Sequence, residues 1–163
     1  MDTQNLQNRM EQLEARLLLL EDQLAILKVI NSWGPAVDGD NPDAAAAIWA
    51  EEGVLISEMK DTRLEGPAAV ARMVRDPGHQ ALIKAGSAHI QSFPVITVEG
   101  ERARAVGFSR VYLHTDDGGH EVWRVSANRW DLRRTEQGWR VTQRQNHVID
   151  GGPEARAILS QAF

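Results

Sequence analysis

Three glycine-containing turns divide the second half of the chain into segments with the alternating pattern of β-strands. The turns are Glu99-Gly100, Asp116-Asp117-Gly118-Gly119 and Glu136-Gln137-Gly138. The segments that they separate are residues 88–98, 102–113, 122–133 and 139–148. Such turns between alternating segments are typical of antiparallel hairpins. The pattern therefore predicts one long antiparallel meander.

The first half of the chain carries helix signals instead. A helix is expected from Leu6 to about Ser32, with Gly34-Pro35 interrupting it. A second helix should begin after Asn41, a good N-cap that is followed by proline, and a third at Gly66-Pro67. A short strand at 54–57 and a last helix at 153–161 complete the prediction. Three helices followed by a meander indicate an α+β fold.

The start of the first helix contains a heptad repeat. One row repeats every seven residues at Leu6, Leu13, Leu20 and Leu27, and its companion row is Met10, Leu17 and Leu24. These rows fit the d and a positions of a coiled coil. The alternative is an amphipathic helix that packs on its own domain. Charged and amide residues around a narrow seam favour an inter-subunit contact before about residue 19, whereas the stripe broadens after Leu24. We therefore expect residues 1–19 to be a helical extension for oligomerisation and residues 20–163 to form the domain.

Composition limits the partners that the chain can have. The 163 residues carry a net charge of −5, so a basic face for nucleic acid is not expected. There is no cysteine, which excludes disulfides and thiolate chemistry. No apolar run approaches the roughly 18–20 residues that cross a bilayer. We expect a cytoplasmic protein with no membrane or nucleic-acid partner.

The order of these elements resembles the SnoaL-like, NTF2-like superfamily. The sequence strings that carry the resemblance are AVDGDNPDAAAAIWAEEGVL, RLEGPAAVARMV and RRTEQGWRVTQRQ. Together they cover about residues 20–150, and the hairpin around Gly138-Trp139 is the most diagnostic. The resemblance implies a cone, or cystatin-like α+β barrel, in which a strongly bent antiparallel sheet wraps around three helices and leaves a pocket.

Within this superfamily, the chain is similar to the branch of scytalone dehydratase and hexachlorocyclohexane dehydrochlorinase. That branch has an aspartate at the end of the first helix and a histidine at the start of the strand after the third helix. Asp38 and His89 occupy those places and are the implied catalytic pair. Ser126, Asn128 and Arg144 match residues that contact the substrate in the branch. The chain departs from the dehydratase in having no tyrosine before Tyr112, and His114 is only an approximate counterpart of its second histidine.

An aspartate beside a histidine is suited to proton removal near neutral pH. The carboxylate fixes the imidazole tautomer and stabilises the imidazolium that forms. Ser126 and Asn128 could donate hydrogen bonds to a developing enolate, and Arg144 could hold an anionic group. Without the resemblance, Asp38 would be interpreted as a turn residue and His89 as a structural histidine.

The sequence therefore predicts a cofactor-independent lyase, similar to a dehydratase, that acts on a small hydrophobic hydroxy-carbonyl or polycyclic compound. One alternative is an isomerase or cyclase with the same pair, and another is a non-catalytic ligand-binding or assembly module. We expect no metal site, since the histidines lack close ligand spacing. A homo-oligomer is expected, with a trimer favoured over a dimer.

Overall fold

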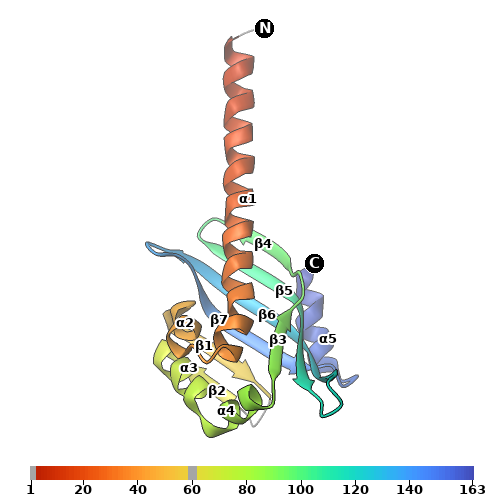
Figure 1. Cartoon of the computed structure of the whole chain (residues 1–163). Helices are drawn as coiled ribbons and strands as arrows, with labels where there is room; N and C mark the ends of the chain where they lie inside the picture. Colours follow the sequence, from red (N-terminus) through yellow and green to blue (C-terminus); the bar gives the residue numbers. More distant parts are fainter. Residues whose placement is uncertain (1–2, 59–61) are drawn as a thin grey trace.

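The computed structural model describes residues 3–58 and 62–163 (Figure 1). The helical elements are α1 (Thr3–Asp38), α2 (Pro42–Ala47), α3 (Gly66–Arg75), α4 (Pro77–Lys84), α5 (Pro153–Leu159) and a 3-10 turn, η2 (Ser160–Ala162). The strands are β1 (Trp49–Ser57), β2 (Thr62–Glu65), β3 (Ser87–Gln91), β4 (Val95–Glu99), β5 (Arg102–His114), β6 (His120–Thr135) and β7 (Gly138–Val148). As expected, the Asn41 side chain caps α2 by accepting a hydrogen bond from the backbone N–H of Ala44 at 3.0 Å.

The strands form one curved, unclosed sheet with the order β2-β1-β7-β6-β5-β3. Its centre is the predicted meander, in which β5, β6 and β7 pair antiparallel, while β1 joins β7 in parallel. The single strand expected at 88–98 is instead two strands, and both pair with β5. Pro94 lies at the break, where its missing N–H cannot continue the ladder.

The lower half of α1 crosses the concave face of this sheet (Figure 1). Its buried residues Ile26, Ile30, Trp33 and Val37 recur at the three- and four-residue spacing of one helix face. They share a core with Trp130 and other inward residues of the strands. On the other face, α5 packs Ile158 and Ala155 against Ala127 of β6. The predicted α+β cone is therefore confirmed.

The expected interruption of the first helix at Gly34-Pro35 is wrong, because α1 continues to Asp38. A Cβ atom at position 34 would overlap the carbonyl oxygen of His89. Glycine is therefore required there for close approach of β3, not for a chain break. Only three residues of α1 follow Pro35, so its missing N–H costs the helix little of its length. As a result, Asp38 ends α1 directly beside β3.

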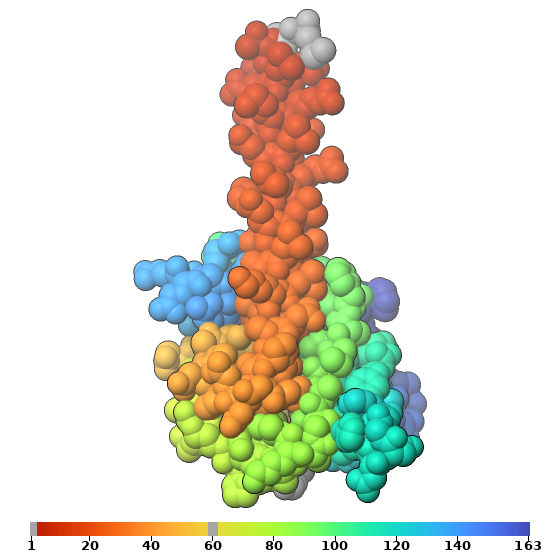
Figure 2. Space-filling model, viewed as in Figure 1, coloured from red at the N-terminus to blue at the C-terminus, as the bar shows by residue number. Residues whose placement is uncertain are grey.

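The N-terminal part of α1 projects away from the domain (Figure 2). Every residue from 3 to 21 is exposed. Asp22 accepts hydrogen bonds from Arg134 and from the indole N–H of Trp139, the latter at 3.1 Å, and so ties the helix to the β6–β7 hairpin. None of the helices in the described residues has the length and apolar character that crossing a bilayer requires.

Candidate active site

The end of α1 and the start of β3 bring the two predicted catalytic residues together. The imidazole Nδ1 of His89 lies 2.6 Å from Oδ1 of Asp38, and the backbone N–H of His89 donates to Oδ2 at 2.6 Å. The hydroxyl of Ser87 donates to Oδ1 at 2.8 Å. Asp38 therefore accepts three hydrogen bonds, one from Ser87 and two from His89. This network fixes the carboxylate against the strand.

These contacts define the protonation pattern of the pair. A carboxylate can only accept, so the proton between the residues belongs to Nδ1 of His89. Burial by itself would raise the pKa of Asp38, but the hydrogen bonds from the His89 side chain and backbone and from Ser87 outweigh it and lower that pKa. The other ring nitrogen, Nε2, has no hydrogen-bond partner among the described residues. It is thus the nitrogen that can take a proton.

His89 lines a cavity of about 580 Å³ between the helices and the concave face of the sheet. Apolar side chains make up much of its wall, namely Trp33, Leu55, Leu64, Ala69, Met73, Leu82 and Trp123. The charged side chains on the wall are three arginines and one aspartate: Arg72, Arg124, Arg144 and Asp76. A cavity of this size and lining is suited to a small, largely apolar molecule with an electron-rich group.

Arg144 is the most deeply buried of these cations, with 3% of the residue exposed. Its guanidinium stacks on Trp33 and Trp130, at 4.9 and 4.3 Å from the ring centroids. No carboxylate among the described residues lies within ion-pair distance of it. Burial and the nearby Arg124 lower the pKa of Arg144 to about 9. Holding a cation here is therefore costly, which is typical of a group kept for binding.

Asn128 fixes the guanidinium of Arg144 from a buried position that does not line the cavity. Its Oδ1 accepts hydrogen bonds from Nε and Nη2 of Arg144 at 3.1 and 2.9 Å, and its Nδ2 donates to the hydroxyl of Ser109 at 2.7 Å. The Asn128 side chain is buried and is not among the residues that line the cavity. Ser126 is also buried, and its hydroxyl has no hydrogen-bond partner in the described part of the chain. The structure thus gathers four of the five predicted site residues in two groups, Asp38 with His89 and Asn128 with Arg144.

Sequence reasoning missed several neighbours of the site. Ser87, which anchors Asp38, lies two residues before His89 and therefore on the same side of β3. Arg124 lies two residues before Ser126, so alternation along β6 could have identified it. His79 is buried in α4, with Nε2 3.0 Å from the carbonyl oxygen of Val37 and its ring 5.9 Å from that of His89. His114 is exposed beside His120 and away from the cavity lining.

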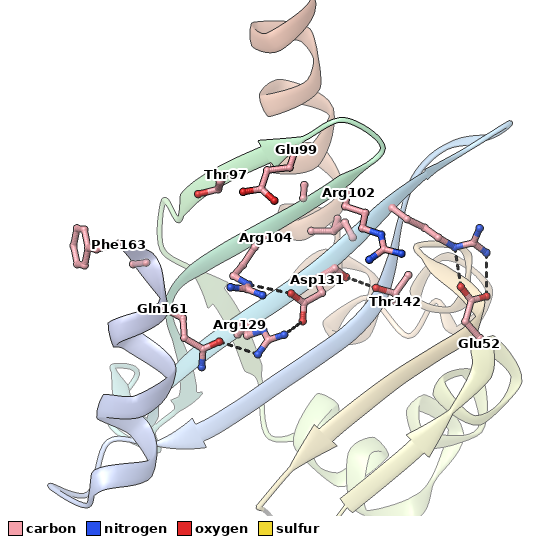
Figure 3. Close-up of a pocket in the computed structure, with 14 residues that line it drawn as sticks. Glu52, Thr97, Glu99, Arg102, Arg104, Arg129, Asp131, Thr142, Gln161 and Phe163 are labelled. Carbon is pink, nitrogen blue, oxygen red and sulfur yellow. Dashed lines mark hydrogen bonds and ion pairs between the residues drawn. The ribbon is translucent and has the colours of Figure 1, made fainter.

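A second hollow, of about 710 Å³, lies on the opposite face of the sheet (Figure 3). Its charged side chains are largely paired with one another: Asp131 contacts Arg104 at 3.2 Å and Arg129 at 2.6 Å, and Glu52 contacts Arg133 at 2.7 Å. This hollow has no histidine in its lining. Within the described residues, no group of three or more histidine or acidic side chains is placed to hold a metal ion. The cavity with His89 is therefore the candidate active site.

The cone fold and the carboxylate–imidazole pair in its cavity define a class of small α+β pocket domains. Residues 19–145 match the profile of the SnoaL-like domain, and the chain belongs to this family. No match was found among the curated proteins.

Two solved structures illustrate the likeness. An NTF2-like protein with a cystatin-like fold from Novosphingobium aromaticivorans is 39% identical, with a TM-score of 0.86 over 90% of this chain and 94% of that one. Hexachlorocyclohexane dehydrochlorinase LinA-type3 from Novosphingobium barchaimii is 13% identical, with a TM-score of 0.70 over 82% of this chain and 90% of that one. At that identity, the second likeness shows the shared fold alone.

Proposed function

We propose that this protein is a cofactor-independent lyase, similar to a dehydratase, that acts on a small hydrophobic hydroxy-carbonyl or polycyclic compound. The observation that carries the proposal is the 2.6 Å contact of Asp38 with His89, which lies on the wall of a largely apolar cavity that also holds the Arg144 cation. An elimination next to a carbonyl requires a base and an anion-binding group, and this cavity holds a candidate for each.

In the proposed reaction, Nε2 of His89 removes a proton from the carbon next to the substrate carbonyl. The electrons of that C–H bond form an enolate, and Asp38 stabilises the imidazolium. The enolate then re-forms the carbonyl, a new C=C bond forms, and the C–O bond to the hydroxyl group breaks. The leaving hydroxyl takes the proton from His89 and departs as water, so the enzyme returns to its starting state.

Arg144 is proposed to stabilise the enolate oxygen through its positive charge. Asn128 supports this proposal as a positioning residue, because it fixes the guanidinium by two hydrogen bonds. Ser126 has a buried hydroxyl on the same face of β6 as Asn128. We propose that it contributes to the polar side of the site when substrate is bound.

The proposal is tested with a panel of hydroxylated tetralones and aryl β-hydroxy ketones. Turnover is followed by the absorbance of the conjugated product and by the loss of one water in the mass spectrum. His89→Gln should lower the rate by about 10²–10⁴, the usual contribution of a general base. The control is His120→Gln, an exposed histidine outside the cavity, which should keep the wild-type rate.

Deuterium exchange at the carbon next to the carbonyl, measured in D₂O, reports proton removal separately from water loss. A product of unchanged mass together with exchange would favour the isomerase or cyclase alternative. An equal rate in His89→Gln and wild type would refute His89 as the base. Binding of the panel without exchange or turnover would support a ligand-binding module instead.

A further inference from the structure

The free part of α1 carries a row of large apolar side chains that no other described part of the protomer covers. Leu6, Met10, Leu13, Leu17, Leu20 and Leu24 are 46–66% exposed. They occupy successive d and a positions of the heptad repeat, which form a single seam along the helix. We refer to these six residues as the leucine seam. A helix that stands alone in water is marginal at this length, so exposed leucines at such regular spacing need a covering surface.

The domain itself does not cover the leucine seam. Asp22, which is tied to Arg134 and Trp139, falls at heptad position f, on the side of the helix opposite to a and d. Ile26 then begins the buried stripe of α1, whereas Leu24 is 66% exposed. The seam therefore faces away from the domain throughout residues 6–24. A second helix could lie against it without meeting the sheet, as the free upper part of α1 in Figures 1 and 2 illustrates.

Charged residues beside the seam specify how a second helix would be oriented. Arg9 and Arg16 fall at position g, and Glu14 and Glu21 fall at position e. In a parallel, in-register coiled coil, each g residue meets the e residue five positions later in the neighbouring chain. Those contacts are Arg9 with Glu14 and Arg16 with Glu21, both between opposite charges.

An antiparallel arrangement would bring like charges together instead, since g then meets g and e meets e. The same four residues have no opposite charge three or four positions away on their own helix. No ion pair within the described protomer uses them either. The spacing of these four charges is therefore suited to ion pairs between two helices and not to ion pairs within one helix.

We propose that residues 6–24 form a parallel, in-register coiled coil between copies of this chain. The leucine seam supplies its core and the Arg9–Glu14 and Arg16–Glu21 contacts fix its orientation. The domains then lie on the outside of one shared helical stalk, all at the same end.

Cysteine cross-linking tests the register directly, because the chain has no cysteine of its own. In a parallel, in-register assembly, Leu6→Cys places two thiols side by side at a d position. Asn8→Cys, at the outward f position, is the matched control. Under mild oxidation, Leu6→Cys should form the covalent dimer at least about tenfold faster than Asn8→Cys, because assembly raises the local thiol concentration. Equal rates would overturn the proposal.

A second pair of variants tests the seam. Leu17→Glu, introduced into Leu6→Cys, should reduce cross-linking to the rate of the Asn8→Cys control. Leu18→Glu is the matched control, because Leu18 is 62% exposed but lies outside the seam at position b. Circular dichroism should show the same strand signal in both, since neither residue contacts the domain. Undiminished cross-linking in the Leu17→Glu background would refute the seam as the contact.

Charge reversal tests the orientation. Arg9→Glu with Arg16→Glu should slow cross-linking of Leu6→Cys, and so should Glu14→Arg with Glu21→Arg. An equal mixture of the two double variants restores opposite charges at the g–e contacts between unlike chains and should recover the cross-link between them. Failure of the mixture to recover it would contradict parallel pairing. Native mass of the full chain then counts the copies.

Discussion

Removing the side chain of Asn128 should destabilise the fold mainly through Arg144. In Asn128→Ala, the guanidinium keeps its stacking on Trp33 and Trp130 but loses both of its hydrogen bonds to protein. The cation then remains buried without a polar partner among the described residues. Leaving buried charged donors without their acceptor in this way costs about 3 kcal/mol. The hydroxyl of Ser109 also loses its donor.

The size of this effect should depend on the charge. In an Arg144→Met background there is no cation to leave unpaired, and Asn128→Ala removes only the neutral contact with Ser109, worth about 1 kcal/mol. The two substitutions should therefore show a coupling free energy of about 2 kcal/mol or more. For a chain of this length, the single Asn128→Ala variant should lower Tm by roughly 6–12 °C.

Urea unfolding of the wild type, both single variants and the double variant gives the coupling directly. The control cycle combines Asn128→Ala with Arg110→Met, because Arg110 is an exposed arginine on β5. That cycle should be additive within about 0.5 kcal/mol. Additivity in the Arg144 cycle as well would refute the argument that Asn128 exists to hold a buried cation.

Two further predictions concern the Asp38–His89 pair. Gly34→Ala should force β3 away from α1, because a Cβ atom there would overlap the carbonyl of His89. We expect the free energy of unfolding to fall by about 1–3 kcal/mol and the NMR signal of the His89 ring to shift. An unshifted signal at wild-type stability would contradict this. Because hydrogen bonds lower the pKa of Asp38 despite its burial, its carboxylate contributes stability above the unfolded value of about 3.9 and loses it as pH falls through the lowered pKa. Asp38→Asn should therefore show a shallower loss of stability than the wild type in urea unfolding from pH 5 to pH 2, and identical slopes would count against the contact.

Local signals in the sequence predicted the elements well. Turn glycines located the meander, and the Asn41 cap located the start of α2. They failed at Gly34-Pro35, because a glycine that permits close packing of two elements has the same appearance in sequence as one that ends a helix. The partner that distinguishes the two cases is the backbone of His89, which is 55 residues away in the chain.

The site was predictable only in part, for a related reason. Asp38 and His89 were paired because a family resemblance placed them at the end of the first helix and the start of the strand after the third, and the structure brings them within hydrogen-bond distance. Asn128 and Arg144 were both expected to contact the substrate. In the structure Arg144 lines the cavity, whereas Asn128 contacts Arg144 and does not line it. This arrangement depends on the register of β6 against β7, in which Arg144 pairs with Trp130 and Asn128 with Asn146. The turn of a hairpin fixes its register, but this register shifts between Asp131 and Leu132, so counting from the turn at Gly138 does not give these pairs.

Two energetically costly buried groups of this domain lie on the concave side of the sheet. A buried arginine without a carboxylate partner in the described residues and the buried hydroxyl of Ser126 both lie on the concave face. A fold selected only for stability would replace them by apolar side chains, since even well-paired buried charges are often improved by that change. Stable folds retain unfavourable groups chiefly where a function needs them. The position of these groups beside the cavity that holds His89 is therefore an argument for a binding or catalytic role that does not depend on any family resemblance.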